Sequence, residues 1–113
     1  MEKLNIPWAK PYFGREELEE VIDSFESDWL TMGKKVERFE TQMAELLCVP
    51  HAVAVTNGTV ALDVALKTVG IQSGDEVIVP AMTYFATAAT VSYQNATPVF
   101  VDIESNTYNL DPK

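Results

Sequence analysis

Apolar residues in the first part of the chain recur at helical spacing. In residues 14–27 they stand at i, i+3, i+4 and i+7, opposite a run of acidic residues that we expect to be a solvated face. A second stretch with similar spacing follows Gly33. The two apolar stripes are Leu18, Val21, Ile22 and Phe25, then Val36, Phe39, Met43, Leu46 and Leu47. The pattern predicts two amphipathic surface helices in a helical segment that spans residues 1–48.

After Pro50 the pattern changes to short apolar runs that alternate with helical stretches. The strands are expected at residues 52–55, 77–79 and 98–103, and the helices at residues 59–69 and 85–93. Strands that are buried on both faces and separated by helices are typical of a parallel α/β sheet. The sequence therefore predicts that residues 49–113 begin such a sheet.

Charge narrows the classes of partner. The 113 residues include 8 Lys and Arg against 17 Asp and Glu, which gives a net charge of −9. This balance argues against nucleic acids and anionic membrane surfaces, because both polyanions need Lys and Arg partners. Small anionic ligands still fit, since backbone amides can bind them locally. Residues 77–101 lack charge, but their prolines and polar residues predict soluble core and not a membrane span.

Cysteine usage and the start of the chain bear on the compartment. Cys48 is the single cysteine, so an intrachain disulfide and a cysteine-based zinc site are excluded. This fits a reducing compartment such as the cytosol, and we expect a cytoplasmic protein. Residues 1–10 do not have the pattern of a signal peptide. We expect Cys48 to pack against its apolar neighbours and not to act as a nucleophile.

Two places at the carboxyl ends of the predicted strands are candidate ligand sites, because ligands of open parallel sheets bind there. Gly58 and Thr59 open a helix, whose N–H groups, partial positive charge and Thr59 hydroxyl suit a phosphate. In the alternative, Thr56 or Asn57 only caps the helix and Gly58 relieves a strained turn. The second place follows Pro80, where one ring of the adjacent pair Tyr84 and Phe85 either stacks on a planar cofactor or belongs to the core.

Two other residues are weaker candidates for a functional role. Asp102 either is a functional carboxylate at a strand end or caps the following turn. His51 has no second ligand at metal-binding spacing, so we expect a loop or strand-edge residue. The glycine motifs of P-loop and dinucleotide folds are absent from the sequence.

Five segments together, in order and spacing, resemble the amino-terminal part of the DegT/DnrJ/StrS-type aminotransferases. They are residues 28–36, residues 39–40, residues 52–66 (AVAVTNGTVALDVAL), residues 74–87 (GDEVIVPAMTYFAT) and residues 96–103 (ATPVFVDI). This family consists of pyridoxal-phosphate (PLP) enzymes of the aspartate-aminotransferase fold that mostly aminate keto-sugars attached to a nucleotide. The resemblance implies that residues 1–113 form a single partial domain, the incomplete amino-terminal part of the large α/β domain.

The resemblance also implies roles for individual residues. Gly58 and Thr59 would hold the phosphate of PLP, and Tyr84 would stack on its pyridine ring. Thr31 and Met32, in loop 29–33, would contact the substrate. The implied partners are a nucleotide-linked keto-sugar, an amino donor, usually glutamate, and a second subunit in a homodimer. The implied pathways make cell-surface polysaccharides or secondary-metabolite sugars.

The chain departs from the family in length. The lysine that binds the cofactor covalently and the aspartate that pairs with the pyridine nitrogen lie further along in the family. None of the lysines here lies in a matching context; they are Lys3, Lys10, Lys34, Lys35, Lys67 and Lys113. We therefore expect an inactive fragment whose first strand lacks its neighbours. Two alternatives are a non-catalytic regulatory or interaction protein on the same scaffold, and a generic α/β nucleotide-binding module.

Overall fold

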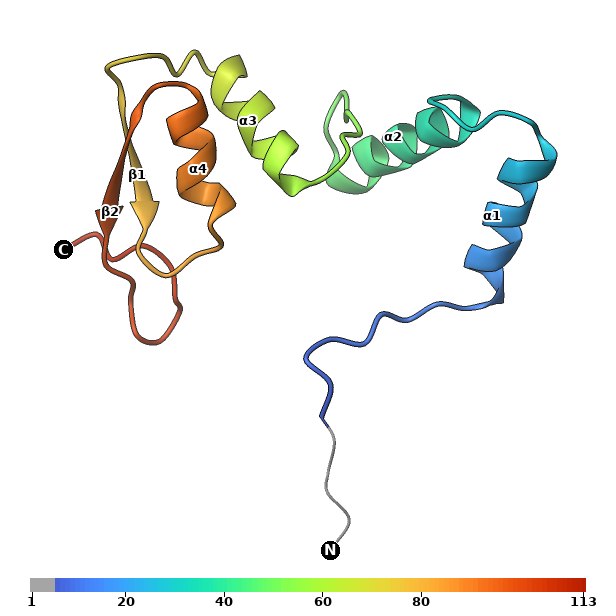
Figure 1. Ribbon diagram of the computed structural model, residues 1–113, viewed down its shortest axis with the longest axis horizontal. Helices are drawn as coiled ribbons and strands as arrows, with labels where there is room; N and C mark the ends of the chain where they lie inside the picture. The colour runs from blue at the N-terminus through green and yellow to red at the C-terminus, as the bar shows by residue number, and fades with distance from the viewer. Residues whose placement is uncertain (1–5) are drawn as a thin grey trace, which may run out of the picture. The chain divides into compact units, whose positions relative to one another are not determined.

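The computed structural model describes residues 6–113, so Lys3 lies outside the described residues. The chain divides into two compact units, residues 1–52 (unit 1) and residues 53–113 (unit 2). Unit 1 contains α1 (Arg15–Glu26) and α2 (Lys34–Leu47). Unit 2 contains α3 (Gly58–Thr68), β1 (Glu76–Pro80), α4 (Ala86–Tyr93) and β2 (Thr97–Val101), as Figure 1 shows.

Both helices expected in unit 1 are confirmed. At the start of α1 the Glu17 side chain accepts a hydrogen bond from the Gly14 N–H at 2.6 Å, which satisfies one of the amides that a helix leaves unpaired. Cys48, the C-cap residue directly after α2, has a left-handed φ of 53°. Cys48 is exposed, so the expectation that it packs is wrong: this conformation turns the chain away after the last helical turn.

Unit 2 is a small parallel α/β unit. β1 and β2 pair in parallel, with Ile78 beside Val99, and α4 forms the crossover between them. Val79, Val91 and Ala96 are buried together. Leu66, Ile71 and Val77 pack against this cluster, so α3 contributes to it as well. The expected parallel arrangement, two of the three expected strands and both helices are confirmed.

Two expectations for the strands are wrong. Residues 52–55 form no strand, because the sheet in the described part of the chain consists of β1 and β2 alone. Val53 is 76% exposed there. The strands are not buried on both faces either: Ile78 and Phe100 are 63% and 59% exposed. Burial on both faces requires cover on both faces, and here α4 packs against β1 and β2 while Leu66 of α3 packs against the cluster that contains Val79.

A membrane-spanning helix was not expected from residues 77–101, and they form β1, α4 and β2. Among residues 6–113, no helix combines the length and the apolar character that crossing a bilayer requires.

Candidate functional site

The first candidate lies at the N-terminus of α3. Asn57 is the N-cap residue, with extended backbone, and its side-chain oxygen accepts a hydrogen bond from the Val60 N–H at 3.0 Å. Its backbone oxygen accepts from the Ala61 N–H at 3.1 Å. Capping by Asn57 therefore satisfies the third amide of the helix and leaves the first two, those of Gly58 and Thr59.

Gly58 has the features that an anion-binding turn needs. Its φ is not among the positive values of the chain, so it relieves no strained turn. A Cβ built on Gly58 would meet no atom within 4 Å, which means that the space beside its backbone is open. In the described structure the N–H groups of Gly58 and Thr59 have no hydrogen-bond partner. Two amides and the positive end of the helix dipole are thus available to a phosphate.

The second candidate is Tyr84, in the loop between β1 and α4. The side chain is 79% exposed, so the alternative that its ring belongs to the core is wrong for this structure. The loop is ordered by local contacts: the Tyr84 oxygen accepts from the Thr87 N–H at 3.0 Å, and the Thr83 and Thr87 hydroxyls lie 2.9 Å apart. The Ala81 N–H continues the sheet by donating to the Val101 oxygen at 2.8 Å.

Both candidates belong to one end of unit 2. α3 and α4 begin at the end toward which β1 and β2 point (Figure 1). Gly58 and Thr59 are in the first turn of α3, and Tyr84 comes two residues before α4. The exposed phenol and the two amides are therefore placed at the carboxyl edge of the strands, where α/β sheets bind ligands.

Asp102 lies at the same edge, directly after β2. Its carboxylate accepts from the Ile103 N–H at 3.2 Å, and its backbone oxygen accepts from the Asp111 N–H at 3.0 Å. These contacts stabilise the turn that follows, which favours the capping alternative. His51 is exposed in the segment after α2.

Thr31 and Met32 belong to unit 1, in the loop between α1 and α2, and both are exposed. The indole N–H of Trp29 donates to the Met32 oxygen at 2.9 Å and closes the loop. A Cβ on Gly33 would lie 2.5 Å from the indole nitrogen, so only glycine fits beneath this ring. The sequence pointed to a loop with Trp29 and Gly33 but did not reveal that they pack on each other.

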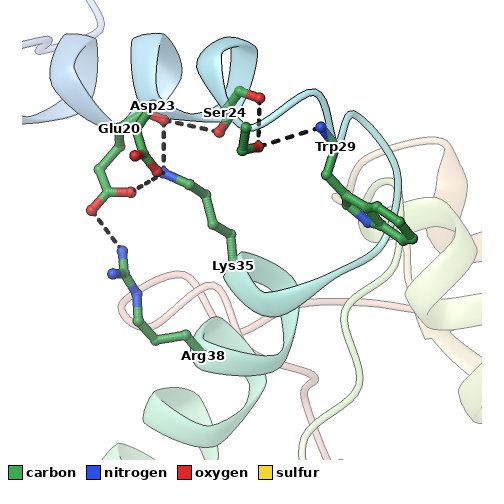
Figure 2. A network of polar contacts seen from close by, with 7 residues as sticks. Glu20, Asp23, Ser24, Trp29, Lys35 and Arg38 are labelled. Atoms are coloured by element: carbon green, nitrogen blue, oxygen red, sulfur yellow. Dashed lines mark hydrogen bonds and ion pairs between the residues drawn. The ribbon is translucent and has the colours of Figure 1, made fainter.

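A charged network joins the helices on either side of this loop (Figure 2). Lys35 of α2 contacts Glu20 and, at 2.8 Å, Asp23 of α1, while Arg38 donates to Glu20 at 2.7 Å. The side chains border an open hollow of about 1420 Å³, which the loop residues 29–33 also line. Hydrogen bonds from Lys35 and Arg38 lower the pKa of Glu20 to about 2. Bonds to Asp23 and Glu20 raise the pKa of Lys35.

The expectation that the acidic run of α1 is only a solvated face is therefore too simple. Glu20 and Asp23 are exposed, yet they bind the basic side chains of α2. The signal in the sequence was the spacing of Lys35 and Arg38, which places two cations on one face of the second helix.

Comparison with known proteins identifies the family. Residues 11–113 match the DegT/DnrJ/EryC1/StrS aminotransferase family. The chain belongs to this family. It is 48% identical over 107 residues to the spore coat polysaccharide biosynthesis protein SpsC of Bacillus subtilis (strain 168), covering 95% of the chain and 28% of SpsC. It is 43% identical over 107 residues to the GDP-perosamine synthase of Caulobacter vibrioides, covering 94% and 29%.

The solved structures confirm the fold. Spr1654 from Streptococcus pneumoniae, in its PLP form, superposes with a TM-score of 0.89 at 38% identity, covering 96% of the chain and 28% of Spr1654. The expected incomplete α/β fold of the PLP-dependent sugar aminotransferases is thus confirmed. The chain spans between a quarter and a third of the length of these relatives. The roles of Gly58, Thr59, Tyr84, Thr31 and Met32 remain predictions.

Proposed function

We propose that the full-length protein containing this chain is a PLP-dependent aminotransferase. It transfers an amino group, usually from glutamate, to a nucleotide-linked keto-sugar that is used for cell-surface polysaccharides or secondary-metabolite sugars. Membership of the family supports the reaction class. The names of two relatives, the spore coat polysaccharide biosynthesis protein SpsC and GDP-perosamine synthase, support polysaccharide synthesis and a nucleotide-linked sugar.

The observation that carries the proposal is the open first turn of α3. The phosphate of PLP is a dianion, and the amides of Gly58 and Thr59 together with the helix dipole can bind it without a basic side chain. This accords with a chain whose net charge is −9. The residues therefore fit the group.

In this proposal the residues of the chain bind and orient the cofactor. Gly58 and Thr59 hold the phosphate, and the exposed ring of Tyr84 stacks on the pyridine with the offset geometry that aromatic faces prefer. When bound, PLP supplies the electron sink that amino transfer requires. Thr31 and Met32 are assigned to substrate contact, on a loop that Trp29 closes.

We further propose that the protein is a cytoplasmic homodimer. The single cysteine, Cys48, is exposed and unpaired, which suits a reducing compartment. Light scattering of the full-length protein tests the dimer, and cell fractionation tests the compartment.

The proposal is tested by removing the phosphate contacts. Gly58→Ala places its methyl group where no atom of this chain lies within 4 Å, so we expect the full-length variant to fold while the methyl group occupies the space of the phosphate. Thr59→Val removes a hydroxyl at similar volume. We expect both variants to weaken PLP binding by about tenfold or more, equal to about 1.4 kcal/mol, and to leave the binding of pyridoxal, which has no phosphate, unchanged.

Thr68→Val is the matched control, because Thr68 lies in the last turn of the same helix, where its hydroxyl bonds to Val64. It should keep the affinity for PLP. Unchanged PLP affinity in Gly58→Ala and Thr59→Val would refute the phosphate site. PLP binding without amino transfer from glutamate would favour a regulatory protein, and protection by nucleotides but not by PLP would favour a nucleotide-binding module.

A further inference from the structure

A polar contact crosses the otherwise apolar packing between α3 and α4. Gln94, the C-cap residue of α4, is 8% exposed, and its side-chain N–H group donates to the Asp63 carboxylate of α3 at 2.5 Å. The same nitrogen donates to the Thr90 oxygen at 3.3 Å. The second oxygen of Asp63 accepts from Lys67 at 2.9 Å. Both carboxylate oxygens and the buried amide nitrogen therefore have partners.

The hydrogen-bond donors around Asp63 determine the protonation state of its carboxyl group. The hydrogen bond from Lys67, and with a smaller effect the one from Gln94, lower the pKa of the Asp63 carboxyl despite partial burial. The group is an ionised acceptor at neutral pH. A hydrogen bond to a charged group is directional and stronger than one between neutral groups. By contrast, the apolar packing of Leu66 against the buried cluster of unit 2 is non-directional, so it holds the helices together without fixing how one slides along the other.

The register of these two helices matters because each carries part of the proposed cofactor site. The phosphate contacts, Gly58 and Thr59, begin α3, and Tyr84 lies two residues before α4. A shift of α3 along α4 would change the separation between the phosphate turn and the ring. PLP carries its phosphate on a short CH2–O linker, so the reach from its ring to its phosphate is limited, and it binds both subsites only when their separation lies within that reach.

We propose that Gln94 and Asp63 are positioning residues, which set the separation between the phosphate-binding turn of α3 and the Tyr84 ring. Neither residue is among the proposed cofactor contacts, which are Gly58, Thr59 and Tyr84. Their contact joins residues 31 positions apart in the sequence and ties the middle of α3 to the end of α4. This inference rests on the proposed function.

The test distinguishes a loss of alignment between the phosphate-binding turn and the Tyr84 ring from damage to either subsite. In the full-length protein, Gln94→Met keeps the length of the side chain and removes the donor. We expect the preference for PLP over pyridoxal to fall by about tenfold. Pyridoxal and inorganic phosphate should each bind as in the unmodified protein, because each subsite stays intact and only the alignment of the two subsites is lost. Asp63→Leu removes the same contact from α3 and should reduce the preference in the same way, which provides a second measurement if Gln94→Met does not fold.

Lys67→Met is the control and should keep the preference, because it removes only the ion pair of a side chain that is 61% exposed. Asp63→Asn retains an oxygen that can accept from Gln94 but loses the charge, so it should lower the preference less than Asp63→Leu does. If the unmodified protein shows no preference for PLP over pyridoxal, the proposed function fails. If it does, and Gln94→Met and Asp63→Leu lower the melting temperature but keep the preference, the contact is merely structural and the positioning role is overturned.

Discussion

Unit 1 and unit 2 are each stabilised internally by a different kind of contact. In unit 1 no residue from 6 to 52 is buried, and α1 contacts α2 through exposed ion pairs of Glu20 and Asp23 with Lys35 and Arg38. In unit 2 a buried apolar cluster of Val79, Val91 and Ala96 joins sheet and helices. Exposed ion pairs are screened by water and salt, whereas burial of apolar surface is the main stabilising term in folding. Unit 2 therefore contributes stability, and the ion pairs of unit 1 mainly orient its helices.

The largest expected effect concerns the isolated chain. The apolar stripe of α1 is exposed, and so are Phe39, Leu46 and Leu47 of α2 and Ile78 and Phe100 of the sheet. A core this small buries too little surface to offset the conformational entropy of 113 residues. We expect the purified chain to aggregate or to unfold without a cooperative transition, as measured by calorimetry together with sedimentation velocity. A sharp, reversible melt of a monomer would contradict this.

The next effect lies in the core of unit 2. Val91 is 1% exposed, so Val91→Ala removes two buried methyl groups and leaves a cavity. In the full-length protein we expect a loss of about 2 kcal/mol in the free energy of unfolding, measured with urea. Val69→Ala is the matched control, because Val69 is 74% exposed, and it should change stability by less than about 0.5 kcal/mol. Equal losses in both variants would show that Val91 is not part of the stabilising core.

The two units also differ in how much of their secondary structure the sequence predicts. Local periodicity was enough for α1, α2, α3 and α4, because helical hydrogen bonds close within the segment. It was also enough for β1 and β2, which are separated by one crossover helix. It failed for residues 52–55, because an apolar run shows that a segment can be a strand but does not supply the neighbour with which it pairs.

The candidate site shows the same limit. Asn57 as N-cap and Gly58 at the helix start follow from local rules. Both interpretations of that turn, a phosphate site and a helix cap, could therefore be predicted from the sequence. The contact between Asp63 and Gln94 could not, since 31 residues separate the partners and no local pattern marks either the helical Asp63 or the C-cap residue Gln94. Resemblance to a family assigned roles to Gly58, Thr59 and Tyr84, but long-range polar contacts had to come from the structure.

A smaller effect is expected in the loop of unit 1. Gly33→Ala places a methyl group 2.5 Å from the indole nitrogen of Trp29, which must then move and lose its bond to Met32. Because Trp29 is 63% exposed and can rotate outward, we expect a cost of about 1 kcal/mol, close to that of one hydrogen bond, with a change in indole fluorescence. In a Trp29→Ala background the same substitution should cost much less. An equal cost with and without Trp29 would mean that the indole is not the obstacle.

The smallest effect is the pH response of the ion pairs in unit 1. Lys35 and Arg38 lower the pKa of Glu20 from 4.5 to about 2, so the folded state favours its ionised form. The resulting stabilisation is complete above pH 4.5 and is lost as the pH falls toward 2.

An NMR titration of the Glu20 carboxyl should give a midpoint near 2 in the full-length protein, and Lys35→Met or Arg38→Gln should move it toward 4.5. High salt should move it the same way, since the pair is exposed. A midpoint near 4.5 at low salt would mean that the contacts do not persist in solution, and that α1 is then held beside α2 by the loop alone.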